Sequence, residues 1–161
     1  MNSSHIREAL SIPFFRNHFM GFLFIDSLKL SKKKHKYMDF YIVNTNHVFG
    51  EHWFACIHVK SAWIIFDCSA FTPEKNHEAL EKILSKETRV IFDRRQLQNP
   101  TSLSCGLHSI SYIYFMFRLF SKGDLSFEYT HNYYCDRLLE YCTRSHFTPD
   151  MFVYHLNALL Q

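Results

Sequence analysis

The sequence predicts an α+β fold in which the middle of the chain forms a small sheet flanked by helices. Segments rich in β-branched and aromatic residues alternate with turn signals between positions 40 and 93. A Thr-Pro-acidic sequence, which starts helices well, occurs at 72–74 and again at 148–150. The 161 residues are 47% hydrophobic and include only four glycines and four prolines, which leaves little room for a linker. We therefore expect a single domain spanning residues 1–161.

The strands are expected in the first two thirds of the chain. Ser3 or Ser4 can cap a first helix through "HIREAL". The expected strands are 21–28, 40–45, 52–59, 63–67 and 89–93. Only "KSA" separates the third from the fourth, which indicates a hairpin. The turn lacks the glycine or asparagine that two-residue loops favour, so we expect a four-residue loop over 60–63.

Helices are expected between and after these strands. Thr72 can cap a helix at about 73–85, with Pro73 in its first position and Glu74 near the positive end of its dipole. A polar segment, 94–104, precedes a helix from about Cys105 to Phe120. One long or two short helices should cover 125–146, and a last helix should cover 149–160.

The stretch "QNPTSLSCGLHS", residues 98–109, places a thiol directly ahead of a long apolar helix. If Cys105 lies at the N-terminus of that helix, the free backbone N–H groups and the macrodipole favour a thiolate and lower the thiol pKa. Gly106 beside it would let a substrate backbone approach closely. The alternative for an isolated cysteine is a buried packing role.

A nucleophilic cysteine needs a base, a group that orients the base, and donors for the oxyanion. His52 begins a strand after a turn-like segment and is a candidate base. Asp67 ends the next strand and can orient the imidazole if the hairpin leaves two or four residues unpaired, since a one-residue slip would move it to the other face. With the four-residue loop Asp67 would oppose Cys56, so a bend or bulge would have to bring it to His52.

Four features in order resemble the adenovirus-type cysteine proteases, the adenain family, and more distantly the ubiquitin-like-protein-specific proteases. They are an Asn-Thr pair and a His-Trp pair in "VNTNHVFGEHWFACIHV", an aromatic-acidic pair one hairpin later in "WIIFDCSAF", and Gln98 seven residues ahead of the Cys105-Gly106 pair. The resemblance covers roughly residues 40–112. It implies a papain-like cysteine protease fold with a small central mixed sheet.

The resemblance also implies roles. Cys105 would be the nucleophile, His52 the general base and later acid, Asp67 the orienting carboxylate and Gln98 an oxyanion-hole donor. Around them, three residues would contact or support the substrate site: Trp53, Gly106 and Asn44. An aspartate at position 67 is closer to the ubiquitin-like-specific relatives than to the glutamate of the best-known adenoviral enzymes.

The function implied is a thiol endopeptidase that cleaves precursor proteins of a DNA virus or a virus-like element. Such an enzyme needs no cofactor for its chemistry, although relatives are activated by DNA or a peptide. We expect a monomer in the nucleus or cytoplasm of a host, also packaged in virions, without a membrane span. Two other functions stay open: an isopeptidase acting on ubiquitin or a ubiquitin-like modifier, and a catalytically silent nucleic-acid-binding protein.

The formal charge is only +3, but the basic residues gather in "KLSKKKHKY", residues 29–37. A solvated loop is one interpretation and a DNA contact is the other. The lysines of the DNA contact would be Lys32, Lys33, Lys34 and Lys36.

Five cysteines without a Cys-x-x-Cys pair or a secretory leader indicate reduced thiols in an intracellular compartment. Cys56 and Cys68 could form a redox pair, although reduced core thiols are the simpler interpretation. A zinc site would require four residues of the 125–146 region: His131, Cys135, Cys142 and His146. On one continuous helix these span about 22 Å, too far for one tetrahedral ion, although a break near 137–141 could fold them together. We predict that they pack the helix and that there is no metal site.

Overall fold

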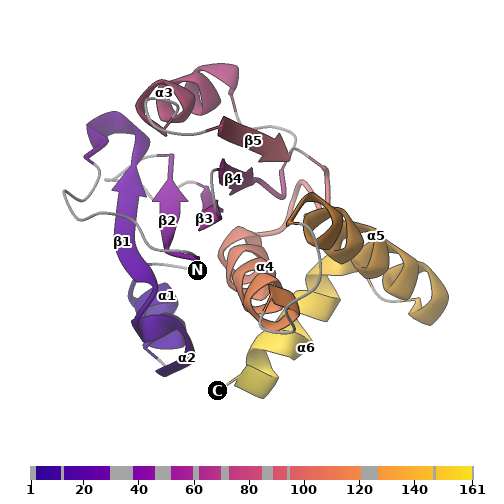
Figure 1. Ribbon diagram of the computed structural model, residues 1–161. Helices are drawn as coiled ribbons and strands as arrows, with labels where there is room; N and C mark the ends of the chain where they lie inside the picture. The colour runs from indigo at the N-terminus through magenta and orange to yellow at the C-terminus, as the bar shows by residue number, and fades with distance from the viewer. Residues whose placement is uncertain are drawn as a thin grey trace.

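The computed structural model describes residues 3–11, 13–29, 38–45, 52–59, 62–69, 73–84, 89–93, 95–120, 127–146 and 148–160. Within these ranges the strands form one five-stranded sheet in the order β1-β2-β3-β4-β5. Helices pack around the sheet (Figure 1), so the α+β class predicted from the sequence is confirmed. The lysines at 32, 33, 34 and 36 and the expected cap Thr72 lie outside the described residues.

The sheet is mixed, with a central antiparallel part and a parallel strand at each edge. β1 runs parallel to β2, β2 to β4 are antiparallel in sequence order, and β5 runs parallel to β4. The strands are β1 (Phe19–Phe24), β2 (Phe40–Asn44), β3 (Trp53–Val59), β4 (Ala62–Phe66) and β5 (Arg89–Asp93). Each overlaps a strand expected from the sequence.

The hairpin of β3 and β4 has a shorter connection than the sequence led us to expect. Val59 pairs with Ala62, only three positions further along the chain, so the four-residue loop was wrong. This register places His58 opposite Trp63, and their ring centroids lie 4.8 Å apart. Cross-strand side-chain contacts of this kind outweigh the weaker preference of the turn residues. Continued by one pair beyond Ala55 and Phe66, the register places Asp67 opposite Phe54, two residues from His52.

The two faces of the sheet are covered by different helices, α3 (Glu74–Leu84) and α4 (Cys105–Phe120), which lie on opposite sides of it (Figure 1). Trp53, Ala55 and Ile57 of β3 join the buried cluster that contains the apolar residues of α4. Phe54 and Cys56 join the second cluster, which includes Leu80 and Leu84 of α3. The alternation predicted for this strand is therefore present.

The remaining helices are α1 (Ser3–Leu10), α2 (Pro13–Arg16), α5 (Phe127–Ser145) and α6 (Pro149–Leu160). The α4 start and end match the sequence expectation, and α5 is one helix rather than two. The four-residue α2 was not predicted, because so short a segment shows no helical periodicity. The expected strand 21–28 ends at Phe24, where a 3₁₀ turn over Ile25–Ser27 begins; its aspartate and serine favour turns over strands.

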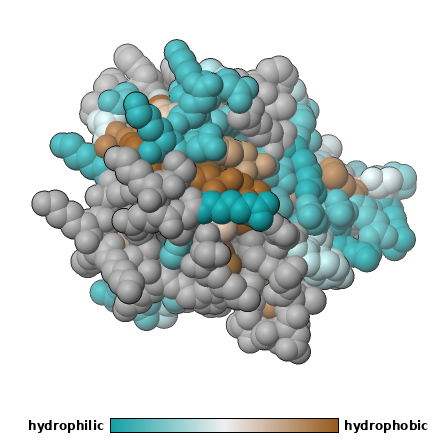
Figure 2. Space-filling model, turned by 45° about the horizontal axis from the view of Figure 1, so that its top comes forward, coloured by the Kyte–Doolittle hydropathy of each residue, from teal (hydrophilic) through white to brown (hydrophobic). Residues whose placement is uncertain are grey.

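The surface is mixed in character. Figure 2 shows one face on which hydrophobic residues gather near the middle, with hydrophilic residues around them. Among the helices of the described ranges, none is both long enough and apolar enough to span a bilayer.

Candidate active site

The sheet places His52 and Asp67 at the same edge. His52 directly precedes β3 and Asp67 directly follows β4, and the two strands are antiparallel neighbours. His52 Nε2 lies 2.7 Å from Asp67 Oδ1. The His52 carbonyl also accepts a hydrogen bond from the backbone N–H of Thr45, at 3.1 Å, which ties the start of β3 to the end of β2. Because Val59 pairs with Ala62, His52 and Asp67 come into contact without the bulge that a four-residue loop would have required.

Asp67 is fully buried and accepts hydrogen bonds on both oxygens. Besides His52, its partners include His77 Nε2 at 3.0 Å and the Ser69 backbone N–H at 3.0 Å. His77 lies on α3 and was not among the site residues expected from the sequence. Its spacing from Leu80 and Leu84 carries a signal, since positions i, i+3 and i+7 share one face of a helix. A histidine on the buried face of α3 needs a polar partner, and Asp67 supplies it.

Cys105 is the first residue of α4, as predicted, and its side chain is buried. Burial raises the pKa of its thiol, but the hydrogen bond with His52 and the His52 charge lower it, and backbone N–H groups of Trp53 and Gly106 add to this. The net result is a pKa below the ordinary thiol value. A helix N-terminus favours an anion in the same way.

The pKa of the His52 imidazole is shifted in the opposite direction, upward. Burial lowers the pKa of its imidazole, but hydrogen bonds to Asp67 and Cys105 outweigh burial and raise it to about 9. Because the thiol pKa falls and the imidazole pKa rises, the pair favours a thiolate beside an imidazolium. Sulfur, imidazole and carboxylate are thus linked in one chain of interactions.

Gln98 lies buried beside this group, on the segment that leads into α4. Its Nε2 donates to the Ser102 carbonyl at 2.5 Å, and its Oε1 accepts from the Cys68 thiol at 3.2 Å. Its backbone N–H donates to the Cys68 carbonyl, at 3.0 Å. Gln98 is therefore attached to the residue that follows Asp67. An amide nitrogen has two hydrogens, so one of them is not used in the bond to Ser102.

The three expected supporting residues adjoin the same edge. Trp53 is the buried first residue of β3, and its indole packs on Phe22 with ring centroids 5.5 Å apart. Asn44 is the fully buried last residue of β2 and pairs with Trp53 across the strands. Gly106 follows the thiol in the first turn of α4.

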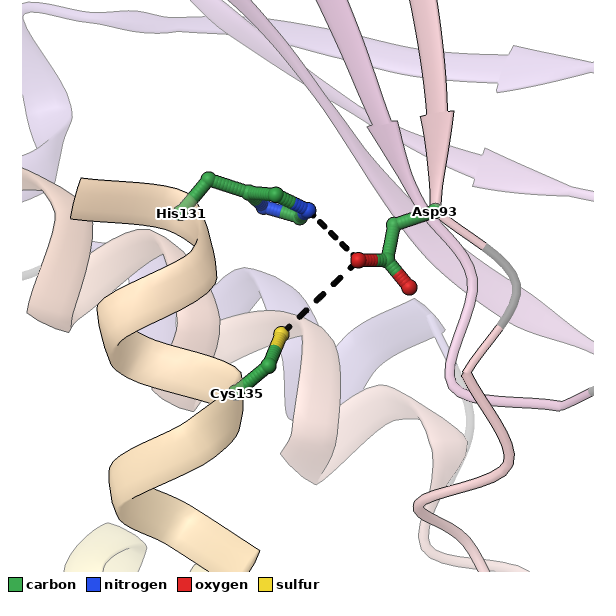
Figure 3. Close-up of side chains that lie close together, drawn as sticks. All are labelled: Asp93, His131 and Cys135. Carbon is green, nitrogen blue, oxygen red and sulfur yellow. Dashed lines mark hydrogen bonds and ion pairs between the residues drawn. The ribbon is translucent and has the colours of Figure 1, made fainter. Parts of the chain in front are cut away.

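All five cysteines are unbridged and buried. Of the four residues that a zinc site would have required, His131 and Cys135 come together, and their third neighbour is Asp93 of β5 (Figure 3). Within the described ranges, these three residues are the set of side chains whose ligand atoms lie close enough together to hold a metal ion, within 4.8 Å of one another.

Hydrogen bonds and an ion pair already occupy this second cluster. Asp93 Oδ2 lies 2.6 Å from His131 Nε2 and 3.1 Å from the Arg95 guanidinium. The other ring nitrogen of His131 lies 2.7 Å from the Tyr112 hydroxyl. A metal ion would have to displace the His131 contact and sit next to a positive guanidinium, which opposes it. The donor set therefore does not fit a cation, and the cluster links α5 to β5.

No family model matches the chain, and no match was found among functionally curated proteins. A solved structure described as a de-sumoylating protease is similar to it, with 14% sequence identity over 98% of this chain and 76% of that chain. The TM-score of this comparison is 0.42.

Proposed function

We propose that the protein is a papain-like cysteine peptidase in which Cys105 attacks the carbonyl carbon of a peptide bond. The observation that carries the proposal is the chain of contacts from the Cys105 thiol through His52 to Asp67, a buried carboxylate. A nucleophile, a base and a group that orients the base are the parts that thiol hydrolysis requires.

The chemistry proceeds in two halves. The Cys105 thiolate adds to the carbonyl carbon, and the backbone N–H of Cys105 with the Gln98 amide stabilises the oxyanion. The imidazolium of His52 gives its proton to the leaving amine as the C–N bond breaks. His52 then takes a proton from water as the water oxygen attacks the thioester. The C–S bond breaks and the thiolate is restored.

Asp67 holds the His52 ring in the orientation that both proton transfers need. Its Oδ1 lies 2.7 Å from Nε2, so Nδ1 is the ring nitrogen left to exchange a proton with the sulfur and the leaving group. The negative charge of Asp67 also stabilises the imidazolium that forms.

For the substrate we propose a polypeptide, in particular a precursor protein of a virus or virus-like element, because of the adenain-like order of motifs. The residue that favours the second candidate, an isopeptidase for a ubiquitin-like modifier, is Asp67 itself, since an aspartate at this position is closer to the ubiquitin-like-specific relatives. A modifier carrying a C-terminal fluorogenic amide separates the two: the isopeptidase cleaves it efficiently, whereas the precursor-processing enzyme prefers short peptides.

A peptide vinyl sulfone probe tests the thiol chemistry. We expect labelling of the wild type at Cys105 and loss of labelling in both Cys105→Ala and His52→Ala. Cys142→Ala is the matched control, because Cys142 and Cys105 are each 6% exposed but burial raises the pKa of Cys142. Equal labelling of Cys105 and Cys142 in the wild type would contradict the proposal. Salt-sensitive DNA binding in Cys105→Ala, without peptidase activity in the wild type, would favour the silent nucleic-acid-binding protein.

A further inference from the structure

The segment between Gln98 and Cys105 determines where the two expected oxyanion donors lie. One donor is the side chain at its start, and the other is the backbone N–H at its end. Hydrogen bonds inside the segment fold it into a compact turn: the Ser102 N–H donates to the Asn99 carbonyl at 2.9 Å, and the Ser102 hydroxyl donates to Ser104 Oγ at 2.8 Å. These contacts set the shape of the segment, but they do not attach it to the rest of the molecule.

Gln98 is bound to Cys68, and a single carboxylate from a distant part of the chain attaches both ends of the segment to α6. Asp150, in the first turn of α6, accepts the Asn99 backbone N–H on Oδ2 at 2.8 Å. Its Oδ1 accepts the Ser104 hydroxyl and lies 3.1 Å from His108 Nε2. Asn99 follows Gln98, Ser104 precedes Cys105, and His108 lies one turn beyond Cys105 on α4. Asp150 therefore binds both ends of the segment and the helix that carries the thiol.

The surroundings of Asp150 keep its carboxylate charged and hydrogen-bonded. The residue is buried, and His108 is fully buried. Burial raises the pKa of Asp150, but hydrogen bonds from His108, Ser104 and Asn99 outweigh it and lower the pKa to about 2. The carboxylate is thus charged at any pH at which the peptidase would work. Charge-assisted hydrogen bonds of this kind are stronger than neutral ones.

We propose that Asp150 is a positioning residue of the peptidase site, which fixes Cys105 and Gln98 relative to each other through Ser104 and Asn99. The inference rests on the proposed function. Oxyanion donors act only when they are held close to the productive geometry, so the attachment of both ends to one rigid helix has a catalytic consequence.

The test compares Asp150→Asn with Asn157→Ala. Asn157 is buried on the same helix α6, and its amide donates to the Leu107 carbonyl at 3.3 Å and to Ser111 Oγ at 3.0 Å. It therefore ties α6 to α4 as Asp150 does, but away from the segment 98–104. Both variants should lower the Tm. Only Asp150→Asn should lower kcat, by about 10- to 100-fold with KM changed less than twofold, because a lost oxyanion donor costs about 10²–10³ in rate.

The pH dependence of Cys105 alkylation by iodoacetamide, mapped by mass spectrometry, is a second readout. If Asp150 acts by positioning, Asp150→Asn moves the thiol midpoint upward, because the thiol loses its alignment with His52 and the Gly106 N–H. If Asp150 acted only through its charge, the midpoint would move downward, and the proposal would be overturned. An effect of Asp150→Asn on kcat no larger than that of Asn157→Ala would overturn it as well.

Ser104→Ala decides the matter if Asp150→Asn does not fold. This variant removes one partner of the carboxylate and should lower kcat about 3- to 10-fold; an unchanged kcat overturns the proposal. A wild type that cleaves no peptide defeats the proposed function alone, because the shift in the alkylation midpoint between wild type and Asp150→Asn is still measurable.

Discussion

His77 donates a hydrogen bond to Asp67 at 3.0 Å, on the carboxylate oxygen that His52 does not use. The two imidazoles come from different parts of the chain, one from helix α3 and one from the residue that directly precedes β3. Asp67 therefore has a fixed orientation before any substrate arrives. The hydrogen bond from His52 to Asp67 then fixes the orientation of the His52 ring.

Replacement of His77 by Phe should impair both folding stability and turnover. The variant removes one hydrogen-bond donor from a buried carboxylate, which costs about 1–3 kcal/mol of unfolding free energy in urea titrations. Misplacement of His52 should lower kcat by up to about 10²-fold. His77→Gln offers an amide N–H near the same position and should recover part of the loss in kcat. If the glutamine variant is as slow as the phenylalanine variant while equally stable, the orienting role of His77 is wrong.

The pKa changes at Cys105 and His52 predict a bell-shaped pH profile of kcat/KM. Activity should rise as the Cys105 thiol ionises below its ordinary range and fall as the His52 imidazolium loses its proton near pH 9. Hydrolysis of a fluorogenic peptide between pH 5 and 10.5 checks both limbs. Cys142 provides the contrast, because burial raises its pKa and its alkylation rate should keep rising above pH 9. A peptidase profile that rises through pH 10 would contradict the thiolate–imidazolium pair.

We expect the cluster of Asp93, His131 and Cys135 to bind no metal ion. Dialysis against a chelator is expected to leave the Tm and kcat unchanged, because Arg95 and His131 already satisfy the Asp93 carboxylate. By contrast, His131→Phe should lower the unfolding free energy by about 1–3 kcal/mol, since the carboxylate then loses a donor. A thiolate-to-cobalt absorption band that appears with Co²⁺ and disappears in Cys135→Ser would show that the cluster does bind a metal ion.

Local sequence signals predicted most of the elements that hold the site. The turn-rich stretch before Cys105 and the apolar residues after it set the start of α4, and the Thr-Pro-Asp sequence set the start of α6. There the Met151 backbone N–H donates to Thr148 Oγ1 at 3.2 Å, as a helix cap does. These features depend on neighbouring residues only, which is why a sequence can show them.

Contacts between distant segments were harder to predict. The β3–β4 register depends on the pairing of His58 with Trp63, which the turn residues do not reveal. The partners His77 and Asp150 act across 10 and 46 residues, to Asp67 and Ser104, and these contacts form only after α3 and α6 pack. In the sequence, an aspartate at position 150 is fully explained by the positive end of the helix dipole. Nothing in the neighbouring residues therefore indicates its contacts with Asn99 and Ser104.

The raised pKa of His52 makes a prediction about folding stability as a function of pH. The imidazole pKa is raised from 6.5 to about 9 in the folded state, so the folded protein binds the proton more tightly than the unfolded chain. The stabilisation is therefore fully present below pH 6.5 and is lost as the pH rises through 9. The difference in unfolding free energy between wild type and His52→Gln should accordingly be large at pH 6 and small at pH 10, as measured by urea titration at both values. His155→Gln, which removes an exposed imidazole on α6, controls for the general effect of losing a histidine. A wild-type advantage over His52→Gln that grows between pH 6 and pH 10 would mean that burial, rather than the hydrogen bonds to Asp67 and Cys105, dominates the imidazole.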